Sequence, residues 1–167
     1  MKNEIIPFSL FEEISVDIGI KNSDEIVNEL NNILSNHFIL FMKLWNYHWI
    51  VVSEKFKNIH EFFNELYDKF FENIDSVAER IRSLGGRPHG SFKEYIETAT
   101  LKEYYGRTTP DSNEMIKDVL EDYETLIKQI RKALTDIELD NGTNKLLEDL
   151  IEMYEKDAWM LRSNLKY

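Results

Sequence analysis

The chain has 167 residues, of which 43% are hydrophobic and 13% aromatic, and it carries a formal net charge of −11. That length predicts a single domain with a substantial core, and the absence of any apolar run near the roughly 20 residues that span a bilayer predicts no membrane helix. The negative charge disfavours DNA and anionic membranes as partners and favours small cations.

The N-terminal segment, residues 1–22, shows no clear structural pattern, whereas helical periodicity runs through residues 23–167, which we expect to form one domain. The segment from Met1 to Gly19 lacks the basic start and continuous apolar stretch of a signal peptide, which predicts a cytoplasmic location. Cysteine is absent from the sequence, so any bound metal would have to be held by nitrogen and oxygen ligands.

Two long helices are predicted in the first half of the domain. The first runs from about 23 to 51, and Asn22 followed by Glu25 predicts its N-terminal cap. The second runs from about 56 to 84, and Gly85-Gly86 predicts its end. The stripe of the first helix mixes apolar residues with two histidines, of which we expect His37 to face the core or an interface: Ile26, Leu30, Ile33, His37, Phe41, Leu44 and His48.

The second half of the domain is predicted to hold a crossover and two further long helices. Ser91 to Ile96 predicts a two-turn helix within the crossover. Asp111 predicts the start of the third long helix, which we expect to end at Asp140-Asn141-Gly142, and the fourth begins near Thr143. Together these elements predict an all-α, ferritin-like four-helix bundle with a short extra helix in the long crossover between its second and third helices.

Three side chains that can bind metals share one face of the second predicted helix: His60, Asp75 and Glu79. Helix geometry places His60 about 22 Å from Asp75, at roughly 1.5 Å of rise per residue, so one chain cannot join them around a metal. Two copies of this helix packed antiparallel about a twofold axis would bring His60 opposite the partner's acidic pair. His48 would fold back beside His60 through the short connection between the helices.

The predicted site therefore lies between subunits and combines two imidazoles with two carboxylates. This set of nitrogen and oxygen ligands suits iron, zinc or manganese without selecting among them.

The order and spacing of these residues resemble the signature of Dps-type miniature ferritins, from the first long helix to the C-terminus. The motifs that carry the resemblance are Asn46-Tyr47-His48-Trp49, Phe56, Ile59-His60-Glu61, Asp75-Ser76-Val77-Ala78-Glu79-Arg80-Ile81, Leu84-Gly85-Gly86-Arg87-Pro88, Lys102-Glu103-Tyr104 and Ala158-Trp159-Met160-Leu161-Arg162-Ser163.

The resemblance implies a homododecameric shell with ferroxidase centres at its twofold interfaces. In those centres His48 and His60 of one subunit would face Asp75 and Glu79 of another. Iron(II) would be oxidised by hydrogen peroxide, with oxygen as a slower oxidant, and the ferric product would be mineralised inside the shell. Such a protein would be an oxidoreductase that stores iron and protects the cell against oxidative stress.

Two positions depart from that pattern or add to it. Asn64 stands where the family usually has an acidic residue, and a neutral amide is a weaker metal ligand. Trp49, adjacent to His48, is interpreted as a packing residue or as an electron donor to the site.

The N-terminal segment has only Lys2 and Lys21 in place of the lysine-rich arm with which some members bind DNA.

Two alternative functions stand beside this one. The chain could be a nucleoid protein whose shell condenses DNA, although its charge disfavours this, or a metal-buffering shell with an impaired di-iron centre, as Asn64 suggests.

Overall fold

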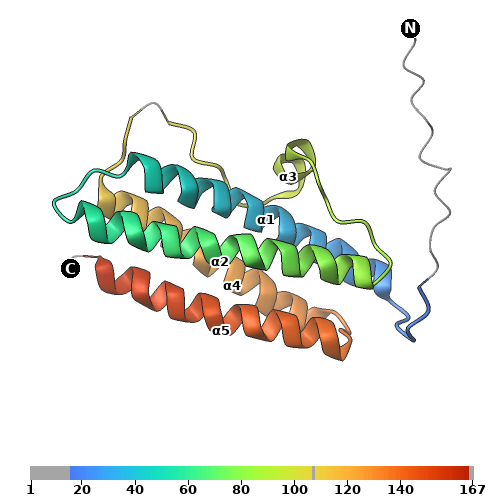
Figure 1. Ribbon diagram of the computed structural model, residues 1–167. Coiled ribbons are helices and arrows are strands. Elements are labelled where there is room, and N and C mark those ends of the chain that lie inside the picture. Colours follow the sequence, from blue (N-terminus) through green and yellow to red (C-terminus); the bar gives the residue numbers. More distant parts are fainter. Residues whose placement is uncertain (1–15, 107, 166–167) are drawn as a thin grey trace, which may run out of the picture.

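The computed structural model describes residues 16–106 and 108–165, so the expectation for the N-terminal segment lies mostly outside the described residues. Five α-helices form the regular structure of the described part, which confirms the all-α prediction (Figure 1). Their bounds are α1, Ser23–Ile50; α2, Phe56–Ser83; α3, Phe92–Thr98; α4, Ser112–Asp136; and α5, Asn141–Asn164.

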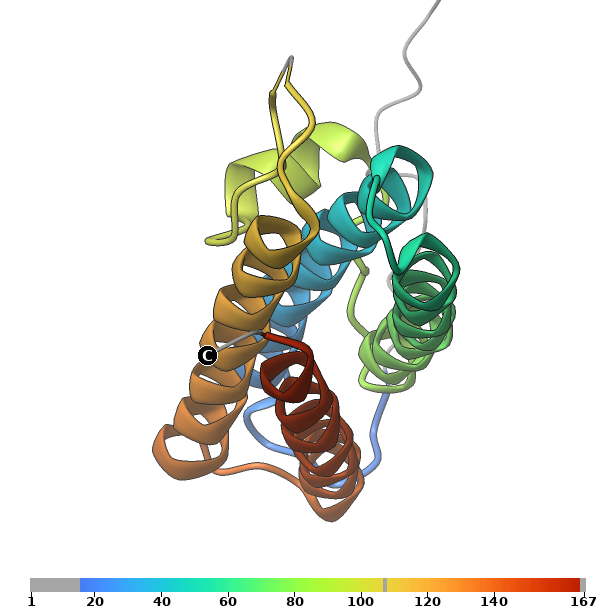
Figure 2. The same cartoon turned by 90° about the vertical axis from the view of Figure 1, so that its left-hand side faces the viewer.

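The four long helices form a bundle in which α1 packs against α2 and α4, and α5 packs against α4 and α2. Seen along the bundle, they occupy its four corners, and α3 lies outside against α1 (Figure 2). A short connection joins α1 to α2, which are antiparallel. The crossover has to run the length of the bundle, because α4 starts at the end opposite to the one where α2 stops (Figure 1). This is the arrangement that the sequence predicted.

The core of the bundle is apolar and aromatic, and it includes one histidine. Tyr123, Tyr154 and Phe70 are fully buried at its centre. The imidazole of His37 lies among these rings with no exposed surface, and its Nε2 is 2.8 Å from the Tyr154 hydroxyl. Burial lowers the pKa of His37 to about 3, so this imidazole remains neutral. The prediction that His37 faces the core is confirmed.

The ends of α2 and α4 follow the sequence signals. Gly85 adopts a φ of +85°, a left-handed conformation that glycine tolerates, and the amide of Gly86 donates to the Ile81 carbonyl at 3.0 Å. Asp111 forms a complete capping box with Glu114 at the start of α4.

Two other helix ends differ from the prediction. Asn22 makes no side-chain cap at α1 and instead donates to the Glu138 carbonyl at 2.8 Å. Asp140 accepts from the amides of Gly142 and Thr143, so α5 begins at Asn141, slightly before the expected start. The Asp140 segment therefore caps the last helix, while the preceding helix has already ended at Asp136.

No helix in the described part of the chain combines the length and the apolar sequence that a membrane crossing requires.

The crossover is fastened to α1 by a buried side-chain amide. Asn36, only 1% exposed, accepts hydrogen bonds from the backbone amides of Thr100 at 2.8 Å and Leu101 at 3.0 Å. Its own amide group donates to Thr100 and to Gln129 of α4, at 3.1 and 2.7 Å. One residue thus ties α1, α4 and the crossover together.

Replacing this residue should weaken the fold. We expect Asn36→Ala to lower the free energy of unfolding by about 2 to 3 kcal/mol, because two backbone amides lose their acceptor. Urea unfolding followed by circular dichroism measures the change. Asn28→Ala, at an exposed position of the same helix, is the matched control and should cost far less; equal losses in the two variants would contradict the role of Asn36.

Candidate metal centre

His48 and His60 meet where α1 ends and α2 begins. Their rings are stacked, with centroids 3.7 Å apart and planes 22° from parallel. Each imidazole reaches across to the other helix: His48 Nδ1 lies 2.9 Å from the His60 carbonyl oxygen, and His60 Nδ1 lies 2.8 Å from the His48 carbonyl oxygen. The structure therefore brings together the two histidines that the sequence singled out.

These reciprocal hydrogen bonds fix which ring nitrogen carries the proton. A carbonyl oxygen can only accept, so each Nδ1 must be the donor. In the neutral imidazole each Nε2 then keeps its lone pair, which is the state that a metal ligand requires. The donor set of this chain thus fits a divalent metal ion.

Aromatic rings surround the histidine pair. The ring of Tyr67 meets His48 edge-on at 5.3 Å, and the ring of Phe56 stacks on His60 at 5.0 Å. Trp45 packs against Trp49 at 4.8 Å, and Trp49 remains 58% exposed. Trp49 thus has a packing contact, and its role as an electron donor stays a prediction.

The acidic pair lies elsewhere on the same helix. Asp75 and Glu79 are exposed toward the far end of α2, at the distance from His60 that the helical rise dictates. Within the described residues, no group of three or more histidine, aspartate or glutamate side chains is close enough to hold a metal ion in one chain. The ligand assignment therefore stays a prediction that requires a second subunit.

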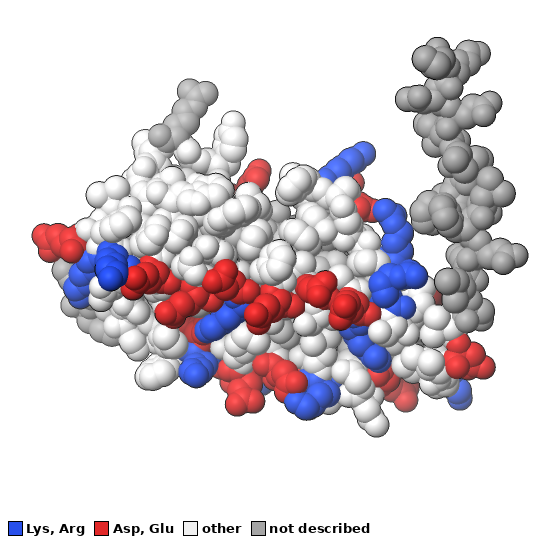
Figure 3. Space-filling view, viewed as in Figure 1, with Lys and Arg blue, Asp and Glu red and all other residues white. Residues whose placement is uncertain are grey.

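Asp75 and Glu79 belong to a longer acidic row on α2. The row crosses the face of the molecule shown in Figure 3. Its exposed members recur every three or four residues and so share one side of the helix: Glu61, Glu65, Asp68, Glu72, Asp75 and Glu79.

Asn64, the residue that departs from the family pattern, is held by two neighbours. Its side-chain amide donates to an Asp68 carboxylate oxygen at 2.7 Å, and its carbonyl oxygen accepts from the Tyr67 hydroxyl at 2.6 Å. Sequence reasoning missed Tyr67. The available signal was its position two turns after His60, which places it close to the histidine face of α2.

The part of α1 that carries His48 is anchored to α4 by a buried ion cluster. Lys43, 4% exposed, lies 3.0 Å from Asp118 and 2.6 Å from Asp122. Tyr47, which precedes His48, donates its hydroxyl to Asp118 at 2.7 Å. Burial, opposed by the hydrogen bond from Lys43, raises the pKa of Asp122 to about 6.

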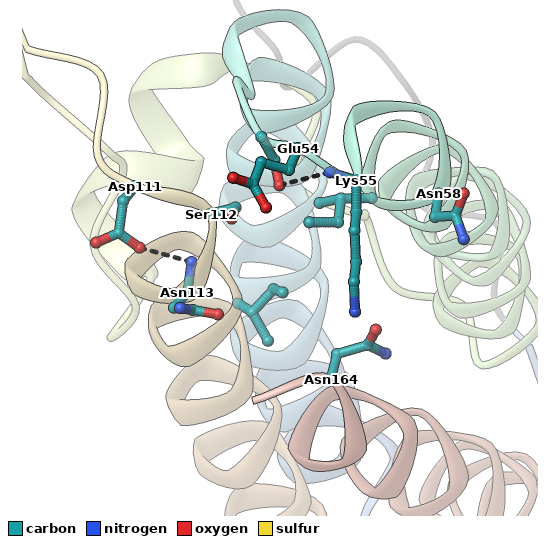
Figure 4. A pocket seen from close by; sticks show the side chains of 10 residues that line it. Glu54, Lys55, Asn58, Asp111, Ser112, Asn113 and Asn164 are labelled. Carbon is teal, nitrogen blue, oxygen red and sulfur yellow. Dashed lines mark hydrogen bonds between the residues drawn. The ribbon is translucent and has the colours of Figure 1, made fainter. Parts of the chain in front are cut away.

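A separate pocket of about 410 Å³ opens at the end of the bundle, between the α1–α2 connection, the start of α4 and the end of α5 (Figure 4). Glu54, Lys55 and Asp111 line it, but neither His48 nor His60 does. It is therefore distinct from the histidine pair.

Comparison with known proteins confirms the resemblance seen in the motifs. The family model of the ferritin-like domain matches residues 27–167. A low temperature-induced protein of Nostoc sp. is 39% identical over 89% of this chain and 85% of its own length. The DNA protection during starvation protein 2 of Bacillus anthracis is 35% identical over 84% of this chain and 97% of its own length.

A solved structure agrees with these sequence relatives. The crystal structure of a Dps protein from Vibrio cholerae O1 is described as a member of a broad superfamily of ferritin-like diiron-carboxylate proteins. It is 31% identical, with a TM-score of 0.80, and the match covers 91% of this chain and 100% of that one.

The raised pKa of Asp122 predicts a pH dependence of stability. In the folded protein Asp122 keeps its proton up to about pH 6, whereas in the unfolded chain it loses the proton near its ordinary value of 3.8. Its contribution to stability should therefore fall as the pH rises through that interval, by about 3 kcal/mol at most.

Asp122→Asn removes this titration, so the stability of the variant relative to the wild type should increase from pH 4 to pH 6, as measured by urea unfolding. Glu121→Gln, which removes a charge from an exposed neighbour, controls for net charge. A difference between the Asp122 variant and the wild type that does not change with pH would contradict the assignment.

Proposed function

The chain belongs to the Dps-type miniature ferritins of the ferritin-like family, and we propose that it oxidises iron(II) and stores the ferric product inside a shell of its own copies. Membership of this family supports a role in iron storage and protection. The proposed oxidant and number of subunits come from the likeness to this family, and the proposed residues of the centre come also from the geometry of α1 and α2.

The observation that carries the proposal is the histidine pair. Two imidazoles from different helices are oriented by hydrogen bonds to each other's backbone, and both leave Nε2 available. Such orientation of a metal ligand through its second ring nitrogen is the usual arrangement in metal centres, because it fixes both the tautomer and the ring.

The carboxylates would come from a second subunit. If two α2 helices pack antiparallel with His60 opposite Asp75 and Glu79, the twofold axis passes near the middle of α2. Phe71 lies close to that point and is 66% exposed. An aromatic ring this exposed, on the same side as a half-exposed Phe56, is consistent with a face that a partner subunit covers. Twelve subunits in a closed shell are the assembly implied by the family.

The proposed reaction transfers electrons from iron to peroxide. Each hydrogen peroxide molecule takes one electron from each of two iron(II) ions, and with two protons it leaves as two water molecules. The imidazoles of His48 and His60 would hold the substrate ion, and the carboxylates of Asp75 and Glu79 would balance the charge of the ferric product. Zinc or manganese could occupy the same ligands, and Trp49 could supply an electron from the edge of the site.

DNA condensation is a poorer account of the chain. A surface with the acidic row of α2 and a net charge of −11 repels phosphates.

The decisive variant removes both imidazoles. Anaerobic loading with iron(II) followed by hydrogen peroxide should give rapid ferric absorbance in the wild type. In the double variant His48→Ala, His60→Ala the rate should fall by more than about tenfold, because the substrate loses both nitrogen ligands.

His89→Ala is the matched control. It removes an imidazole that lies 3.1 Å from Ser35 in the crossover region, away from the stacked pair, and should leave the rate nearly unchanged. Equal rates in the double variant and the wild type would exclude the proposed centre.

A further inference from the structure

Asn64 lies one turn after His60 on the same side of α2, where a side chain can reach an ion held by the histidines. An aspartate there would offer a charged ligand, whereas asparagine offers only the oxygen of a neutral amide. Whether that oxygen is free therefore decides whether this chain adds a third ligand to its two imidazoles.

The hydrogen bonds of Asn64 fix its orientation. The Asp68 carboxylate can only accept, so the nitrogen of the Asn64 amide must face it, as the 2.7 Å contact shows. The amide oxygen then has to face Tyr67, whose hydroxyl donates to it at 2.6 Å. One lone pair of this oxygen, the only Asn64 atom that could bind a metal ion, is therefore already taken, and the short hydrogen bond holds the oxygen toward Tyr67.

Tyr67 is well placed to keep this arrangement. The Asn64 oxygen can only accept, so the Tyr67 hydroxyl is the donor in the 2.6 Å contact between them. Its ring is held edge-on against His48 and also contacts Trp45, at 5.3 and 6.4 Å. The phenol therefore cannot turn away without losing contacts to the histidine pair.

Asp68 does not replace the missing ligand. It lies two turns beyond His60, about 12 Å along the helix at roughly 1.5 Å per residue, which is too far to share an ion with that imidazole. Its carboxylate also accepts the Asn64 amide.

We propose that the hydrogen-bonded chain Tyr67–Asn64–Asp68 closes the second metal position of the centre, so that each subunit holds one iron(II) ion firmly and a second only weakly. The inference rests on the proposed function, since it assumes that His48 and His60 bind iron(II). It assigns to Tyr67 a positioning role: the phenol acts on the metal through Asn64. Under this arrangement the second electron that hydrogen peroxide needs comes from an iron(II) ion that binds to the centre only transiently.

The number of iron(II) ions bound per subunit tests the inference directly. Assembled protein is titrated with iron(II) under argon in a calorimeter, and only the ions that disappear in the His48→Ala, His60→Ala variant are counted, which removes weak binding to the acidic row. The wild type should bind one such ion per subunit. Asn64→Asp should bind two, because the new carboxylate, one turn after His60, supplies the charged ligand that the amide oxygen does not. Asn58→Asp, which adds the same charge at another exposed position of α2, should still bind one.

A further variant tests Tyr67 itself. Tyr67→Phe keeps the ring against His48 and frees the Asn64 oxygen, so a second ion should become measurable, about tenfold or more weaker than the first. A second ion no tighter than in the wild type would overturn the role of Tyr67.

Two results would overturn the proposal that the second metal position is closed. The first is that the wild type binds two histidine-dependent ions per subunit, and the second is that Asn64→Asp binds only one. If the double histidine variant lost no ions relative to the wild type, the metal centre of the proposed function would itself fail, which is a distinguishable result. Size-exclusion chromatography and circular dichroism establish that each variant has folded and assembled.

Discussion

The exchange of hydrogen bonds between His48 and His60 is the contact on which the rest of the account depends. Each imidazole donates to a backbone carbonyl of the opposite helix, so the two rings, the end of α1 and the start of α2 are fixed by one interaction. The His48 carbonyl lies in the last turn of α1, where intrahelical donors run out, and the His60 ring supplies one. The hydrogen bond that supplies a donor to this carbonyl therefore also orients the His60 ring as a metal ligand.

Contacts within the bundle fix the position of the histidine pair. Lys43 and Tyr47 tie the last turns of α1 to Asp118 of α4, and Asn36 ties the middle of α1 to the crossover. Buried polar contacts of this kind are costly unless every partner is present, so they favour one register of the helices over its alternatives. The ligands of the proposed centre thus stand on helices rather than on loops, although a metal ion would bind at the edge of the subunit.

Sequence reasoning reached the fold because it depends on periodic spacing, and the same spacing singled out His48 and His60, whereas the full ligand set stays a prediction. The stripes around His37 and His60 predicted the helices, and the distance between His60 and Asp75 showed that a single chain could not form the site. Details that depend on three-dimensional neighbours were out of reach. The hydrogen bond from Asn22 to the Glu138 carbonyl is such a detail, because the two residues lie far apart in the sequence. Two local details were missed for other reasons: Asp140-Asn141-Gly142 also favours a turn, and the hydrogen bond between Tyr67 and Asn64 depends on side-chain rotamers.

Subunit complementation tests most directly whether the centre is shared between chains. One variant lacks His48 and His60, the other lacks Asp75 and Glu79, and each alone should be inactive toward iron(II) and peroxide. When equal amounts are unfolded together and co-assembled, random pairing across a twofold axis rebuilds about a quarter of the centres, so about a quarter of the wild-type rate should return. No recovery from correctly assembled mixed shells would contradict a site formed by two subunits.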